Sequence, residues 1–203
     1  MTRKGIANDP ERKARITQAA LDLIAEGGIK AATHRKIAAA AEVPLGSVTY
    51  HFTSMDHILV EAFTLFGNQL DPRYGIAIAS APTQMDARDV LVDAICGERR
   101  ATQRELRLFR EMYAYGSTSR RVQDLVRSFE ARSISALSVH FAEPAARAID
   151  ALVEGWWIYQ SWTPGGLDPH MVRDAIDALA DKFSNNSPTV QNAESQRKIR
   201  VSG

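Results

Sequence analysis

The segment that most constrains the fold is residues 33–52, which are Thr-His-Arg-Lys-Ile-Ala-Ala-Ala-Ala-Glu-Val-Pro-Leu-Gly-Ser-Val-Thr-Tyr-His-Phe. Thr33 predicts the N-cap of a short helix, and Pro44 and Gly46 predict a turn before a second short helix that ends at Phe52. Two short helices joined by a tight turn form the helix-turn-helix unit, whose second helix enters the major groove of DNA. The segment therefore predicts a DNA-binding module.

Helical periodicity continues through most of the 203 residues, and strand signals are scarce. Gly, Pro, Asp and Ser separate about nine predicted helices, at roughly 10–26, 33–41, 46–52, 55–70, 85–99, 102–115, 119–141, 144–162 and 169–183. We therefore predict an all-α fold, with an N-terminal three-helix domain over residues 1–54 and a larger helical bundle over 55–184. The polar tail, 185–203, is expected to be disordered.

Composition and charge narrow the class of protein. The hydrophobic and charged fractions, 45% and 24%, are ordinary for a globular protein, and no run of 18 apolar residues predicts a membrane span. The polar N-terminus lacks a secretory signal and Cys96 has no partner for a disulfide, so we expect a cytoplasmic protein.

The net charge of +1 is unevenly distributed. Residues 1–52 carry eight Lys or Arg against five Asp or Glu, so this part is basic and the remainder is mildly acidic. A basic N-terminal module fits phosphate contact through one end of the molecule. A chance imbalance on a solvated surface is the alternative.

Residue types within 33–52 predict separate roles. Small or polar groups near helix starts can approach or bind DNA, whereas the apolar positions Ile37, Ala41, Val43, Val48 and Phe52 are expected to form the core. Phosphate contact is predicted for 33–36 and 50–51, base contact for 45, 47 and 49, and close backbone approach for 46. The predicted DNA-binding residues are Thr33, His34, Arg35, Lys36, Leu45, Gly46, Ser47, Thr49, Tyr50 and His51. His51 can equally pack against the following helix.

Residues 40–52, together with the Thr-Ser-Met-Asp-His-Ile-Leu that follows, resemble the TetR family of transcription regulators. The resemblance spans residues 8–63, about a quarter of the chain, and also includes Ala-Ala-Leu at 19–21 and Glu-Gly-Gly at 26–28. Within the family the variant is most similar to the RcdA-like (YbjK-like) subgroup. The resemblance implies a homodimer that binds a pseudo-palindromic operator, a body that binds a small-molecule effector, and repression more often than activation.

Three residues depart from the family pattern. Glu42 stands where the turn usually has Gly, Thr49 where Tyr is common, and Met55 where a Lys is common. The last two changes remove phosphate contacts that the resemblance would otherwise imply. The basic residues at 35 and 36, and an arm around Arg3 and Lys4, are then expected to contribute more of the salt-dependent affinity.

The predicted helix over 144–162 is apolar on two faces. One face carries Ile149, Leu152, Val153, Trp156 and Gln160; the other carries small and large apolar residues from Ala148 to Trp162. A helix apolar around so much of its circumference is buried on two sides, either by a partner subunit or within one subunit. Because the family dimerises through its last two helices, the predicted interface is Ala148, Ala151, Gly155, Ile158, Trp162, Val172, Ile176 and Leu179.

The resemblance also implies an effector pocket walled by the middle helices. Candidate lining residues are the large apolar side chains Phe63, Phe66, Cys96, Phe109, Met112, Tyr113, Phe129 and Trp157. Ordinary core packing is the alternative for each of them. The alternation of Arg and Glu over 104–111 is typical of a solvated helix face.

No residue pattern predicts catalysis. The histidines are scattered, and His57 with Glu61, four residues apart, supplies only two potential metal ligands. We predict a non-enzymatic, ligand-responsive DNA-binding regulator without cofactor or metal, with double-stranded operator DNA, a second copy of itself and an effector as partners. A ligand-independent regulator, an activator and a helical enzyme with a decoy helix-turn-helix are the alternatives.

Overall fold

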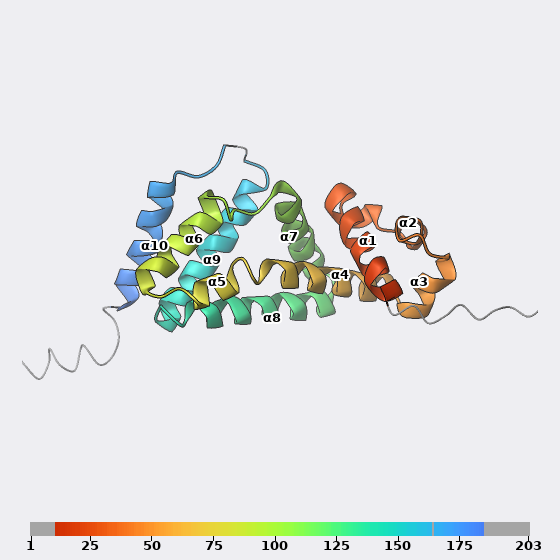
Figure 1. Ribbon diagram of the computed structural model, residues 1–203, viewed down its shortest axis with the longest axis horizontal. Coiled ribbons are helices and arrows are strands. Elements are labelled where there is room, and N and C mark those ends of the chain that lie inside the picture. The colour runs from red at the N-terminus through yellow and green to blue at the C-terminus, as the bar shows by residue number, and fades with distance from the viewer. Residues whose placement is uncertain (1–10, 164, 185–203) are drawn as a thin grey trace, which may run out of the picture. The chain divides into compact units, whose positions relative to one another are not determined.

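The computed structural model describes residues 11–163 and 165–184, and within them it is entirely helical (Figure 1). This confirms the predicted all-α class. The predicted arm at Arg3 and Lys4 and the tail at 185–203 lie outside the described residues. The helices are α1 Glu11–Gly27, a 3-10 turn η1 Ile29–Ala31, α2 His34–Ala40, α3 Leu45–His51, α4 Met55–Leu70, α5 Gly75–Ala79, α6 Gln84–Cys96, α7 Gln103–Gly116, α8 Arg120–Leu137, α9 Glu143–Gln160 and α10 Pro169–Ser184.

The chain divides into two compact units. The first combines Met1–Gln69 with Thr102–Arg127, and the second combines Leu70–Ala101 with Ser128–Gly203. The first unit therefore extends past the predicted domain limit at residue 54, because α4 and α7 group with α1–α3. The predicted boundaries of the DNA-binding domain, at residue 54, and of the larger helical domain, at residue 184, stay a prediction.

The first unit is built on α1. Its buried face, which includes Ile16, Leu21 and Ile24, packs with α2, α3 and α7. Each fully buried side chain of this size contributes roughly 1.5–3 kcal/mol. The other large buried side chains of the unit come from α2, α3, α4, α7 and the start of α8, or adjoin them, and are Ile37, Val48, Phe52, Ile58, Leu59, Phe63, Phe66, Leu106, Leu108, Phe109, Met112 and Val122.

Polar contacts attach α7 to the C-terminal end of α1. Arg107 donates to the carbonyl oxygens of Ala25, at 3.2 Å, and Glu26. A cation at the last carbonyls of a helix satisfies free acceptors and complements the helix dipole. Glu111 accepts from the backbone N–H of Ile29 at 3.0 Å. This face of α7 is thus bound to α1, where we expected a solvated surface.

The core of the second unit lies between α6, α9 and α10, which are mutual neighbours (Figure 1). Its buried apolar residues are Ile78, Ala87, Leu91, Ile95, Leu137, Phe141, Ala145, Ala146, Ile149, Val172, Ile176 and Ala180. A charged contact adds to this packing, since the buried guanidinium of Arg88 donates to Asp177 at 2.9 Å and to Asp181 at 2.7 Å.

Differences from the predicted helices are small and local. The five-residue helix α5 was not predicted, because Pro72 and Gly75 are strong helix breakers. Helix α8 ends at Leu137, four residues before the expected end at Phe141. The three tryptophans of the chain, Trp156, Trp157 and Trp162, lie on α9 or directly after it. Among the described helices, none has the length and apolarity to cross a membrane.

Candidate nucleic-acid interface

Helix α2 begins with a side-chain cap and displays two cations. The hydroxyl of Thr33 accepts a hydrogen bond from the backbone N–H of Lys36 at 3.3 Å, as predicted. Arg35 and Lys36 are exposed in the first turn, and His34 is half-buried. The positive end of the helix and these cations together favour an anion such as a DNA phosphate.

The turn between α2 and α3 is a Schellman motif. Glu42 has the left-handed φ of 52°, the backbone N–H of Val43 donates to the carbonyl of Ala38 at 3.0 Å, and that of Glu42 donates to Ala39 at 3.2 Å. These bonds satisfy the last carbonyls of α2 and fix the direction in which the chain leaves it. Glycine is the residue that adopts this conformation without strain, so Glu42 is unfavourable here.

Helix α3 has one buried side and one exposed side. Val48 and the adjoining Phe52 are buried, whereas Leu45, Thr49 and Tyr50 are exposed. The exposed fraction of Tyr50 is 81%, which is high for an aromatic side chain on a helix held by a packed core. The outer side of α3 is therefore open for contact along its length.

The remaining predicted contact residues lie on or beside that side. A Cβ atom at Gly46 would have no neighbour within 4 Å, so packing within the chain does not require glycine there. The hydroxyl of Thr49 donates to the carbonyl of Gly46 at 3.2 Å, and Ser47 is half-buried. The half-buried ring of His51 meets the ring of Tyr50 edge-on, with centroids 5.0 Å apart. Of the predicted core residues, Ile37, Ala41, Val48 and Phe52 are buried and Val43 is half-buried.

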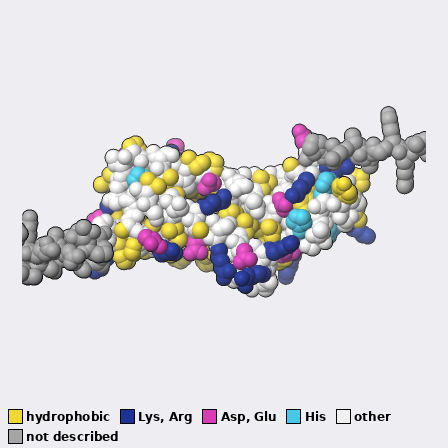
Figure 2. All heavy atoms as spheres, turned by 90° about the horizontal axis from the view of Figure 1, so that it is seen from below, with side chains coloured by type: hydrophobic (Ala, Val, Ile, Leu, Met, Phe, Trp, Pro, Cys, Tyr) yellow, Lys and Arg dark blue, Asp and Glu magenta, His cyan; other side chains and the backbone are white. Residues whose placement is uncertain are grey.

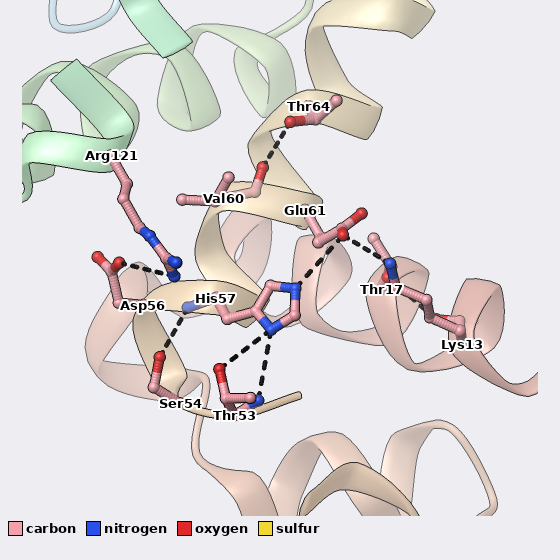
Figure 3. Close-up of polar contacts among 10 residues, drawn as sticks. All are labelled: Lys13, Thr17, Thr53, Ser54, Asp56, His57, Val60, Glu61, Thr64 and Arg121. Carbon is pink, nitrogen blue, oxygen red and sulfur yellow. Dashed lines mark hydrogen bonds and ion pairs between the residues drawn. The ribbon is translucent and has the colours of Figure 1, made fainter. Parts of the chain in front are cut away.

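In the first turn of α4, His57 contacts the segment that follows α3 and the neighbouring Glu61 of its own helix (Figure 3). The Nδ1 atom of His57 accepts from the backbone N–H of Thr53 at 3.3 Å, and its Nε2 lies 3.5 Å from Glu61. Glu61 also accepts from Lys13 of α1 at 2.6 Å, and this hydrogen bond lowers the pKa of the Glu61 carboxyl despite partial burial. Through Lys13, Glu61 thus joins α4 to α1. Among the described residues there is no group of three or more side chains that could hold a metal ion.

Asp56, in the first turn of α4, binds the α7–α8 junction. It accepts from the hydroxyls of Ser119 at 2.5 Å and Tyr115 at 3.2 Å, and its other oxygen lies 4.0 Å from Arg121. Burial, with the Asp56 charge beside it, raises the pKa of the Tyr115 phenol. Sequence reasoning missed this cluster because its members are about 60 residues apart along the chain.

On the part that carries α1–α3, Figure 2 shows Lys, Arg and His side chains mixed with hydrophobic and acidic ones. An open groove of about 690 Å³ also runs along α1 and α4 in this unit. It is lined by Glu11, Lys13, Ala14, Arg15, Thr17, Gln18, Glu61, Thr64, Leu65 and Asn68, none of which was among the predicted pocket residues.

The predicted pocket residues divide between the two units. Phe63, Phe66, Phe109, Met112 and Tyr113 belong to the first unit, and all but the half-buried Tyr113 are buried. The other three, which are Cys96, Phe129 and Trp157, belong to the second unit and are half-buried. Burial raises the pKa of the Cys96 thiol.

The predicted dimer residues on α9 differ from those on α10. Ala151, Gly155 and Trp162 are exposed, and Ala148 and Ile158 are half-buried. On α10, Val172 and Ile176 have exposed fractions of 0% within the core of their own unit, and their place in a dimer interface stays a prediction. Leu179 packs against the same core.

The comparisons with known proteins agree with this geometry. Residues 16–62, from α1 into α4, match the family described as bacterial regulatory proteins, tetR family. A solved transcriptional regulator from Streptomyces coelicolor A3(2) is 34% identical, with a TM-score of 0.77 over 84% of this chain and 99% of its own. The chain belongs to the TetR family. It is therefore a DNA-binding transcriptional regulator with an N-terminal helix-turn-helix.

Two further relatives are more distant. The HTH-type transcriptional regulator BetI 1 from Chromohalobacter salexigens is 26% identical over 197 residues, which cover 89% of this chain and 96% of the relative. The multidrug binding protein EbrR, in its complex with imidazole, is 26% identical with a TM-score of 0.71, over 85% of this chain and 96% of its own. Other EbrR structures hold proflavin, malachite green and ethidium.

Proposed function

We propose that this TetR-family protein is a homodimeric repressor whose two α3 helices bind the halves of a pseudo-palindromic operator. The observation that carries the proposal is the exposed side of α3, which presents Tyr50 outward while Val48 and Phe52 hold the helix against the core. In a dimer, two such helices would enter successive major grooves about one helical turn, roughly 34 Å, apart. A protein that binds operator DNA in this way would act in the bacterial cytoplasm, in association with the nucleoid.

The proposed division of contacts follows exposure and chemistry. Arg35, Lys36 and Tyr50 are exposed groups that can bind phosphates, and Thr33, His34 and His51 lie beside them. Leu45, Ser47 and Thr49 offer an apolar group and two hydroxyls to base edges, and Gly46 allows close backbone approach. The RcdA-like subgroup stays a proposal that rests on the sequence resemblance.

A second copy of the chain is the proposed partner for the outer face of α9. Exposed small residues, Ala151 and Gly155, lie on it together with the exposed aromatic residues Tyr159 and Trp162. Small residues let a second helix approach closely, and large exposed aromatic side chains gain from burial at an interface. Light scattering at micromolar concentration tests this, and a monomer mass would refute it.

The body is proposed to bind a small-molecule effector that reduces operator affinity. EbrR, which shares the fold at 26% identity, binds several small organic molecules, and this supports a similar capacity here. An effector that binds the body better when the two α3 helices are out of register with the grooves would shift the population away from the DNA-bound state. The pocket remains proposed at the eight residues named above.

Thermal-shift screening separates an effector-responsive regulator from a ligand-independent one. A ligand that binds the folded state raises the apparent melting temperature. We expect at least one such compound in a library of organic cations, fatty acids and aromatic metabolites, and we expect it to weaken operator binding. A screen that finds no stabilising compound would favour the ligand-independent alternative. Transcription in vitro from a template that carries the operator distinguishes a repressor, which lowers it, from an activator, which raises it.

DNA binding is tested by selecting genomic fragments with the purified full-length protein and measuring their affinity by fluorescence anisotropy. We expect the combined Arg35→Ala, Lys36→Ala and Tyr50→Ala variant to lose at least 100-fold in affinity, since each phosphate contact contributes to the salt-dependent part of binding. The matched control removes two exposed cations from the second unit, as Arg147→Ala and Lys182→Ala. Equal affinity of the two variants would contradict the assigned interface.

A further inference from the structure

We propose that Arg120 and Arg121, at the start of α8, form a second phosphate-binding site that contacts the DNA backbone beside the helix-turn-helix. The inference rests on the proposed operator binding and adds a contact from outside the helix-turn-helix. It assigns to these arginines a nucleic-acid contact in place of a purely structural role.

The first observation is the absence of Lys and Arg from α3 and α4. Between Lys36 and Arg73 the sequence contains no Lys or Arg, so α3 and all of α4 carry no permanent positive charge. Binding to a polyanion still requires cations near each contacted phosphate. A phosphate beside the C-terminal end of α3 and the start of α4 must therefore be neutralised by residues from another part of the chain.

The second observation is that the α7–α8 junction is fixed against the start of α4. The carboxylate of Asp56 binds the hydroxyls of Ser119 and Tyr115, at 2.5 and 3.2 Å, which come from the junction and from the last turn of α7. These contacts lie within one compact unit with α1–α3. They attach the start of α8 to the first turn of α4. Thr53 and Ser54, which are exposed, immediately precede that turn in the sequence.

The third observation is the availability of the two guanidinium groups. The side chain of Arg121 is 64% exposed and lies 4.0 Å from Asp56 (Figure 3), and that of Arg120 is 79% exposed and lies 3.4 Å from Asp124. Exposed ion pairs of this kind contribute little to stability, so both groups can turn toward a phosphate at little cost. Arginine also binds phosphate with two parallel N–H donors.

The negative charge of Asp56 at the start of α4 also requires a nearby cation if a phosphate is to bind there. Asp56 is acidic and would repel a phosphate that approaches the first turn of α4, although the free N–H groups of a helix start attract one. Arg121 offsets that negative charge at close range. The face of the molecule on the side of α8 shows Lys and Arg side chains among acidic ones (Figure 2), so the surface is not uniformly repulsive to DNA.

The test is the salt dependence of operator affinity for the full-length protein. Each neutralised phosphate contributes about −0.9 to the slope of log K against log salt concentration. Because the proposed dimer carries two copies of each arginine, the double variant Arg120→Gln, Arg121→Gln should have a slope about 3.6 smaller in magnitude than the wild type. Between 50 and 200 mM salt its affinity should fall about a hundredfold less, while its ranking of operator sequences is unchanged because phosphate contacts carry no sequence information.

A matched control and a rescue variant make the result specific. Arg127→Gln removes a 57% exposed cation of the same helix, which also pairs with Asp124, and it should leave the slope unchanged. Arg120→Lys with Arg121→Lys retains both charges and should restore most of the slope. A wild-type slope in the double Gln variant, or an equal loss in the control, would overturn the proposal. If the wild-type protein itself binds no DNA fragment, the proposed function fails instead.

Discussion

The ammonium group of Lys13 lies 2.6 Å from a carboxylate oxygen of Glu61, so one ion pair joins α1 to the middle of α4. The same ammonium group lies 5.8 Å from the centre of the Phe52 ring at the end of α3. Three segments of the helix-turn-helix unit therefore meet at one cation. The orientation of α4 relative to α1 depends in part on this contact.

A double-mutant cycle with Lys13→Met and Glu61→Gln should give a coupling free energy of about 0.5 kcal/mol in urea unfolding, because both side chains are partly exposed. Since the folded-state pKa of Glu61 is lowered, its contribution is present above the unfolded pKa and is lost as pH falls through the folded pKa. The coupling should therefore vanish in strong acid. A coupling that persists there would contradict the ion pair.

Glu42→Gly should stabilise the protein by about 1 kcal/mol, because glycine adopts the left-handed conformation of residue 42 without strain. The control Glu42→Ala removes the same charge but keeps the backbone strain. Urea unfolding should show a gain for Gly and little change for Ala. An equal gain for both variants would assign the effect to the carboxylate.

Arg88→Ala should destabilise the protein by about 2 kcal/mol, since it removes a buried side chain and two charged hydrogen bonds to α10. The loss stays below that of a fully buried ion pair because the Asp177 and Asp181 carboxylates are solvated once freed. Arg147→Ala, which breaks an exposed pair with Glu143, should cost less than about 0.5 kcal/mol. Thermal unfolding of both variants measures the contrast.

Asp150→Asn should stabilise the protein at neutral pH but not in acid. The Asp150 side chain is 6% exposed; burial raises its pKa, the hydroxyl of Ser133 partly opposes this, and Glu130 adds to it. A raised folded-state pKa means that ionisation costs stability as pH rises from the unfolded pKa through the folded one. Melting temperatures of the two proteins should converge near pH 3.5 and separate by pH 7. Parallel curves would show that Asp150 does not titrate as inferred.

Much of the fold followed from local sequence. The 3.6-residue periodicity and the helix breakers placed the long helices within a few residues, and the cap at Thr33 placed α2, because capping and amphipathicity act over one or two turns. The buried set Ile37, Val48 and Phe52 followed from the same pattern. The exposed side of α3 was therefore available to sequence reasoning.

Sequence reasoning did not identify the contacts between segments that are distant along the chain. Arg107 caps α1 across about 80 residues, and Asp56 binds Ser119 across 63. Such pairs depend on how helices pack, and a single sequence shows the charges but not their partners. The burial of Val172 and Ile176 within their own unit was missed for a related reason, because an apolar stripe does not reveal whether its own unit or a second copy covers it.

The position of the tryptophans has a practical consequence. Because all three lie on α9 or directly after it, in the second unit, indole fluorescence originates entirely from there. Tyr50, on the outer side of α3, contributes only weak tyrosine emission. A change in tryptophan emission on mixing with DNA would thus report an event transmitted to the body, and a change on self-association would arise next to the exposed Trp162 itself.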